Sequence, residues 1–144
     1  QFVHRWALLG GKKNVDVIAV ANSGWFTMPD RDIDYPYGIK NVGITDEELR
    51  EAFAEPVILF MGEKDVERKP PFRDTPEADA QGMNRMERCT NYFRQCKAKA
   101  EELKVPFRWK LETVEGAAHQ GVKMAEGAAA YIFGKSSEDG NRRV

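Results

Sequence analysis

Two titratable side chains follow predicted strands at positions where ligands commonly bind. Asp65 comes shortly after the apolar run 57–61, and His119 stands in a loop of small residues after the alternating run 107–114. The carboxyl ends of parallel strands share one edge of a sheet, where an aspartate can accept a hydrogen bond from an imidazole and fix its tautomer for acid–base chemistry. The placement also fits a surface-turn aspartate and a locally bonded loop histidine, so spacing alone leaves both readings open.

Three further acidic residues could hold a cation. Asp30, Asp32 and Asp34 alternate along one segment, and alternate carboxylates occur in calcium-binding loops. The glycine and the terminal glutamate of such a loop are absent here. We therefore expect no metal ion at this segment.

Other candidates lie near the strand predicted at 15–21. Trp25, Phe26 and Met28 could line an apolar pocket for an acyl or alcohol group, or could pack beneath their own loop. A nucleophilic serine normally stands on a sharp turn between two flanking glycines, and Ser23 has no glycine two positions before it. His4 is expected to be structural or to face solvent.

Composition excludes two classes of partner and bounds the size. The 144 residues carry 22 basic and 23 acidic side chains, which allows one domain and provides no basic surface for nucleic acid. No apolar run approaches the roughly 20 residues that span a bilayer. Cys89 and Cys96 lie on one predicted helix, about 10 Å apart along its axis, beyond the reach of a disulfide. Free thiols fit a reducing compartment such as the cytoplasm, but they leave the location open.

Hydrophobic periodicity defines the elements that must position these residues. In chain order they are a helix at 1–9, a strand at 15–21, a helix at 46–54 with a capping box at Thr45 and Glu48, a strand at 57–61, a long helix from 76 broken at Gly82, a strand at 107–114, a helix at 122–133 and a polar tail at 135–144. This order predicts an α/β fold, a parallel sheet with helices on both faces.

Strand character gives the expected order within the sheet. The run 57–61 is apolar on both faces, as in a central strand, whereas 107–114 alternates with long charged residues, as in an edge strand. Strand 15–21 is too apolar to leave one side unpaired. We therefore expect it to pair both with 57–61 and with a strand from outside this chain; a complete small three-stranded sandwich is the alternative.

At this point the chain resembles the C-terminal half of the α/β-hydrolase superfamily, whose triad runs Ser, then Asp or Glu, then His. The motifs that carry the resemblance are GEKD at 62–65, GAAH at 116–119, NSGWFTMP at 22–29 and the starting segment QFVHRW. The resemblance implies that residues 1–134 form half of a hydrolase domain, with 22–55 as a cap-like excursion, and that the strands match the last three of the family.

Carried over by that resemblance, Asp65 is the triad acid and His119 is the general base. Some relatives place the acid after the preceding strand, so Asp30, Asp32 or Asp34 is the alternative. The family motif Gly-X-Ser-X-Gly is missing from the sequence. We therefore expect the nucleophile on an N-terminal half, either a separate chain or a segment ending just before Gln1.

The resulting hypothesis is a serine hydrolase that acts on a small-molecule carboxylic ester without a cofactor. A non-catalytic binding or scaffold protein that keeps the fold but lacks the nucleophile is the competing reading. The residues upstream of Gln1 would distinguish the two.

Overall fold

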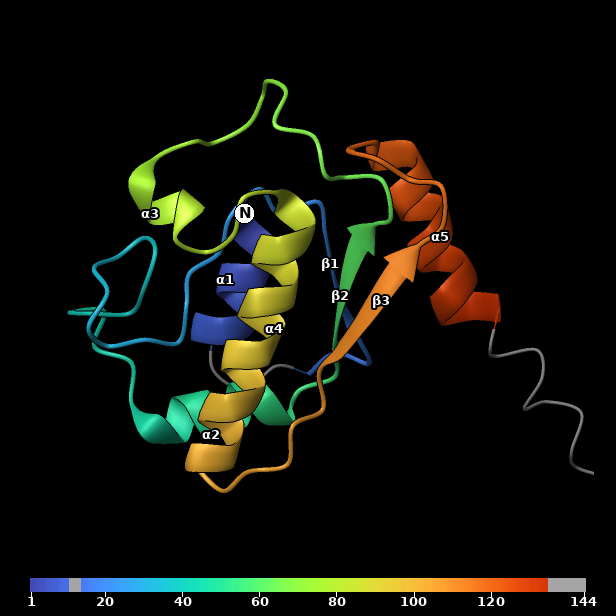
Figure 1. The fold of residues 1–144 in the computed structure, drawn as a ribbon. Coiled ribbons are helices and arrows are strands. Elements are labelled where there is room, and N and C mark those ends of the chain that lie inside the picture. The colour runs from blue at the N-terminus through green and yellow to red at the C-terminus, as the bar shows by residue number, and fades with distance from the viewer. Residues whose placement is uncertain (11–13, 135–144) are drawn as a thin grey trace, which may run out of the picture.

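The computed structural model describes residues 1–10 and 14–134, and the predicted tail 135–144 lies outside them. Eight elements follow in chain order (Figure 1): α1 (Phe2–Leu9), β1 (Ile18–Ala21), α2 (Asp46–Ala54), β2 (Val57–Gly62), α3 (Pro76–Asp79), α4 (Arg85–Glu102), β3 (Lys110–Val114) and α5 (Gly121–Gly134). The predicted order of helices and strands is confirmed.

The described strands form one parallel sheet in the order β1-β2-β3. Helices α1 and α4 cover one face, and α5 covers the other (Figure 1). Leu59 faces the larger hydrophobic cluster under α1 and α4, whereas its neighbours Ile58 and Phe60 face α5. This arrangement confirms the predicted α/β fold with helices on both faces.

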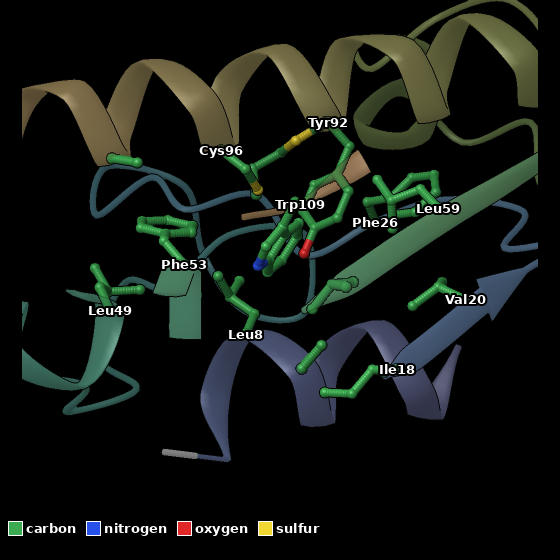
Figure 2. Packing of buried hydrophobic residues seen from close by; sticks show 14 of the residues in the cluster. Leu8, Ile18, Val20, Phe26, Leu49, Phe53, Leu59, Tyr92, Cys96 and Trp109 are labelled. Atoms are coloured by element: carbon green, nitrogen blue, oxygen red, sulfur yellow. The ribbon is translucent and has the colours of Figure 1, made fainter. Parts of the chain in front are cut away.

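The larger core is rich in aromatic residues (Figure 2). Tyr92 of α4 stacks on Phe26, with ring centroids 4.4 Å apart, and contacts Trp109 at 5.9 Å. The indole nitrogen of Trp109 donates a 2.9 Å hydrogen bond to the carbonyl of Ala52. These contacts tie α4, the loop after β1 and the approach to β3 into one layer.

Local signals end and begin the helices as the sequence predicts. The Thr45 hydroxyl accepts from the amide of Glu48 at 3.2 Å, and the Glu48 carboxylate accepts from the amide of Thr45 at 2.8 Å, so the capping box is confirmed. Gly82 has a φ of +149° between α3 and α4, and Asn84 caps α4. The predicted break at Gly82 is therefore confirmed.

Two predicted strands prove shorter than expected. The amide of Ile18 donates to the carbonyl of Pro56 at 2.8 Å; because Pro56 itself has no N–H, the ladder begins there rather than at residue 15. The amide of Arg108 donates to the carbonyl of Phe53 at 3.0 Å, at the end of α2. Arg108 and Trp109 thus bond to the end of α2 before β3 begins at Lys110.

Burial alternates along β1. Ile18 and Val20 are buried, but Ala19 and Ala21 are exposed, so among the described residues the strand is buried on one face only. The alternation arises because Ile18 and Val20 face the aromatic core, while the two alanines face the side of α5. Pairing of β1 with β2 is confirmed, and its second, external partner stays a prediction.

The cysteines lie where the helical stripe predicts. Cys89 and Cys96 are both buried and free, and burial raises the pKa of the Cys89 thiol to about 12 and that of Cys96 well above its usual range. No helix within the described ranges is long and apolar enough to cross a membrane.

Candidate active site

The loops that follow β2 and β3 are joined by backbone hydrogen bonds. The amide of Lys64 donates to the carbonyl of Ala117 at 2.8 Å, and the amide of Glu63 donates to the carbonyl of Val114 at 3.1 Å. Gly62 makes this approach possible, since a Cβ there would lie 2.6 Å from the Ala117 oxygen. The two strand ends are therefore held in register with one another.

This junction brings Asp65 and His119 together. Atom Nδ1 of His119 lies 2.9 Å from Oδ2 of Asp65. The Asp65 side chain is 6% exposed, whereas the His119 side chain is 36% exposed. The acid is thus enclosed by protein while the imidazole reaches the surface.

The geometry defines which ring nitrogen is available for chemistry. An ionised carboxylate only accepts hydrogen bonds, so in this contact the N–H at Nδ1 of His119 donates a hydrogen bond to Asp65. Atom Nε2 is the other ring nitrogen, and it has no hydrogen-bond partner among residues 1–10 and 14–134. An imidazole oriented in this way can accept a proton from a substrate or a nucleophile.

Arg85 of α4 holds the second oxygen of the acid. Its Nη1 lies 3.1 Å from Oδ1 of Asp65, and both side chains are 6% exposed. The same guanidinium donates to the carbonyls of Glu67 and Pro71, and it lies 4.9 Å from the centroid of the Phe72 ring. Asp65 is therefore fixed by Arg85 on one oxygen and by His119 on the other.

The sequence analysis missed Arg85. Arginine is rarely buried, yet Arg85 stands four residues before Cys89 and so in phase with the apolar stripe of α4. An arginine on the sheet-facing side of a helix, next to the strand end that carries Asp65, was the available signal. Arg88 was missed in the same way: it is fully buried and donates to the carbonyl of Gly24 at 2.8 Å.

His119 lines two open cavities. One, of about 260 Å³, lies beside Lys64 and Gln120, and the other, of about 580 Å³, lies beside Trp25 and Arg73. Volumes of a few hundred Å³ suit small organic ligands. A ligand in either cavity would contact the imidazole.

The predicted apolar pocket is only partly present. Trp25 lines the larger cavity with His119. Phe26 and Met28 are each 1% exposed and belong to the main hydrophobic cluster, and neither lines the two cavities at His119; their part in a substrate pocket stays a prediction. Phe26 instead stacks on Tyr92, the packing alternative that the sequence left open.

Ser23 also lies beside a histidine, but its environment does not activate it. Its Oγ is 3.5 Å from Nδ1 of His4, and the amide of Thr27 donates to Nε2 of the same ring at 3.1 Å. Desolvation by burial, with a smaller contribution from the Arg5 charge, lowers the pKa of His4 to about 3. His4 is therefore neutral with its proton on Nδ1, which makes it a donor to Ser23. Its predicted structural role is confirmed, and the solvent-facing alternative is wrong.

The acidic residues Asp30, Asp32 and Asp34 make local contacts away from His119. Asp34 pairs with Lys40 at 3.5 Å, and Asp30 accepts from the amide of Asp32 at 2.8 Å. Asp65, rather than any of these three, contacts His119. Within the described part of the chain, no group of three or more potential ligands is arranged to hold a metal ion.

The parallel sheet with helices on both faces places the chain in the α/β class. Comparisons with known proteins show which α/β proteins it is similar to. The sequence matches no protein-family model and no curated protein. Among solved structures it is similar to poly(aspartic acid) hydrolase-1 from Sphingomonas sp. KT-1, with 32% identity and a TM-score of 0.87 over 92% of this chain and 50% of that one. It is also similar to a poly(3-hydroxybutyrate) depolymerase from Bordetella parapertussis, with 29% identity and a TM-score of 0.84 over 92% of this chain and 45% of that one.

These likenesses confirm the resemblance to the α/β-hydrolase superfamily. The chain spans about half the length of the structures that it matches. Both neighbours are named as enzymes that act on polymers.

Proposed function

We propose that this chain contributes the acid and the base of a Ser-Asp-His triad in a hydrolase that cleaves carboxylic esters or related acyl bonds. The observation that carries the proposal is the 2.9 Å contact between His119 and Asp65 at the ends of adjacent parallel strands. The open Nε2 of His119 and the adjoining cavities are what such a base requires. The nucleophilic serine would come from an N-terminal half that precedes these residues or accompanies them.

In the proposed mechanism Nε2 of His119 accepts the serine proton as the serine oxygen attacks the substrate carbonyl. The resulting imidazolium donates that proton to the leaving alcohol, and the acyl-enzyme is then hydrolysed by a water activated at the same nitrogen. Asp65 holds the ring and stabilises the imidazolium. Arg85 keeps the Asp65 carboxylate in place throughout, through its 3.1 Å contact.

The same comparison supports a proposal for the substrate class. The printed names of the two neighbours refer to poly(aspartic acid) and to poly(3-hydroxybutyrate), and both polymers are joined through acyl carbons. Open cavities at His119, rather than an enclosed one, suit the end or side of an extended acyl compound. We therefore favour an ester-linked substrate with an extended acyl part.

The test uses the intact enzyme, with the N-terminal half joined to this chain, and p-nitrophenyl butyrate as substrate. His119→Gln should lower kcat by about 10²- to 10⁴-fold, the usual contribution of a general base. Lys123→Gln, at an exposed position on α5, is the matched control and should leave kcat unchanged. A serine-directed phosphonate should label the N-terminal half and not residues 1–144.

The competing hypothesis, a non-catalytic binding or scaffold protein, predicts the opposite result. An intact protein without esterase activity and without phosphonate labelling would support a binding or scaffold role and contradict the hydrolase proposal. Ester hydrolysis by the isolated 144 residues would contradict the division of the triad and would bring Ser23 back into consideration.

A further inference from the structure

One cation at the His119 cavity, the exposed Arg73, has no carboxylate partner among the described residues. Arg73 lines the 580 Å³ cavity together with His119 and Trp25. Its Nε donates a 2.7 Å hydrogen bond to the hydroxyl of Tyr37. Arg73 forms no ion pair with any residue in the described ranges, and its other guanidinium nitrogens have no hydrogen-bond partner there.

The surroundings of Arg73 fix the direction in which it points. Its guanidinium lies 5.2 Å from the centroid of the Trp25 ring, within the range of a cation–π contact. The Tyr37 hydroxyl that accepts the hydrogen bond from Nε lies 2.9 Å from the Thr75 hydroxyl. A guanidinium that is held at Nε and on one face loses little further freedom when its two terminal nitrogens bind a ligand.

Besides Arg73 and His119, the ionisable side chains that line this cavity are Arg85 and Asp74. Arg85 is committed to Asp65 and to two carbonyls. Asp74 also lines the cavity, but no ion pair joins it to Arg73. Arg5 adds a second positive charge on the Trp25 ring, at 4.7 Å. The free guanidinium is therefore left for a group that enters the cavity.

We propose that Arg73 binds a carboxylate of the substrate, so that the site prefers esters that carry a negative charge away from the scissile bond. A carboxylate matches the two free terminal nitrogens of a guanidinium in a bidentate pair. The inference rests on the proposed function, since the cavity is taken to receive the substrate of His119. Charge-assisted hydrogen bonds of this kind correspond to a preference of about tenfold to a hundredfold in kcat/KM.

The experiment compares charged esters with their methyl-capped, neutral counterparts on the intact enzyme. One pair carries the carboxylate on the acyl side, as mono-p-nitrophenyl succinate and its methyl ester. The other carries it on the leaving group, as 4-carboxyphenyl butyrate and its methyl ester. A preference for the charged member of one pair identifies the side of the scissile bond that faces Arg73.

Arg73→Gln should reduce that preference by about tenfold or more, chiefly through KM, because it removes the carboxylate partner. Arg73→Lys keeps the charge but not the planar fork and should retain part of the preference. Arg94→Gln, at an exposed arginine of α4 that does not line the cavity, should leave the preference as in the natural enzyme. A ratio of two substrates within one variant is independent of the fraction of folded protein.

Equal kcat/KM for charged and capped esters in the natural enzyme would overturn the carboxylate site while leaving the proposed function intact. A preference that Arg73→Gln does not change would also overturn it. Absence of hydrolysis for all four esters would overturn the proposed function, and the carboxylate site with it.

Discussion

Replacing Arg85 with Met should expose how strongly the candidate acid depends on its buried partner. The guanidinium and the Asp65 carboxylate are 3.1 Å apart and 6% exposed, which corresponds to about 5 kcal/mol of attraction at an effective dielectric constant of about 20. Methionine keeps the aliphatic volume and removes the charge, so that Asp65 retains His119 as its remaining side-chain partner. Because removal of one member of a buried pair leaves an uncompensated charge, we expect Arg85→Met to lower the free energy of unfolding by about 3 kcal/mol.

The assay is urea unfolding of the intact enzyme by linear extrapolation, with midpoints compared at unchanged slope. Arg68→Met is the control, since Arg68 also stacks on Phe72 but pairs with the more exposed Asp79, at 35% and 28% exposure; it should destabilise the protein much less than Arg85→Met. The double variant Asp65→Asn with Arg85→Met removes both charges and should be more stable than Arg85→Met alone. A loss below about 1 kcal/mol for Arg85→Met, equal to the control, would refute the argument from the buried pair.

Three further predictions follow from the described contacts. Because the native pKa of His4, about 3, lies below its ordinary value of 6.5, the unfolded state takes up this proton first as pH falls. The free energy of unfolding should therefore drop between pH 6.5 and 3 by about 1.4 kcal/mol per pH unit more than in His4→Gln, as measured by urea titrations at each pH; parallel pH profiles would contradict this. Cys89 and Cys96 should resist Ellman's reagent in the native enzyme and both react in denaturant, because burial raises their pKa values; a mass two daltons low, from a disulfide, would refute the helical placement. Gly62→Ala should lower kcat by about a hundredfold through displacement of the His119 loop, whereas Gly121→Ala, with nothing within 4 Å of the added Cβ, should not; equal rates would contradict a role for the close approach at Gly62.

Much of the fold could be predicted because its signals are local. The capping box at Thr45, the apolar run of β2 and the three-to-four-residue stripe of α4 each lie within one element. The strand-end rule then placed Asp65 and His119 at one edge of the sheet before any contact was known. Their contact at 2.9 Å agrees with that placement.

The rest depended on partners far away in the sequence. Arg85 is buried because Asp65, 20 positions earlier, neutralises it. Phe26 is a core residue because the side chain of Gln81, 55 positions later, accepts its amide proton at 2.8 Å and the ring of Tyr92 stacks on it. Neither an arginine on an apolar stripe nor an aromatic after a strand reveals such partners by itself.

The predicted strand boundaries were wrong for a related reason. Alternation at 107–114 predicts an extended chain but not the group that its amides contact. Arg108 bonds to Phe53 instead of to β2, so the sheet pairing of β3 begins at Lys110. Periodicity thus predicted the conformation and missed the partner.

The central claim is that His119 acts as the base for a serine that these residues do not contain. The most direct measurement is a crystal structure of the intact enzyme after reaction with a serine-directed phosphonate. We expect a phosphonylated serine on the N-terminal half, with its Oγ about 3 Å from Nε2 of His119 and Asp65 still hydrogen-bonded to Nδ1. A label on Ser23, or a modified serine out of hydrogen-bond reach of His119, would contradict it.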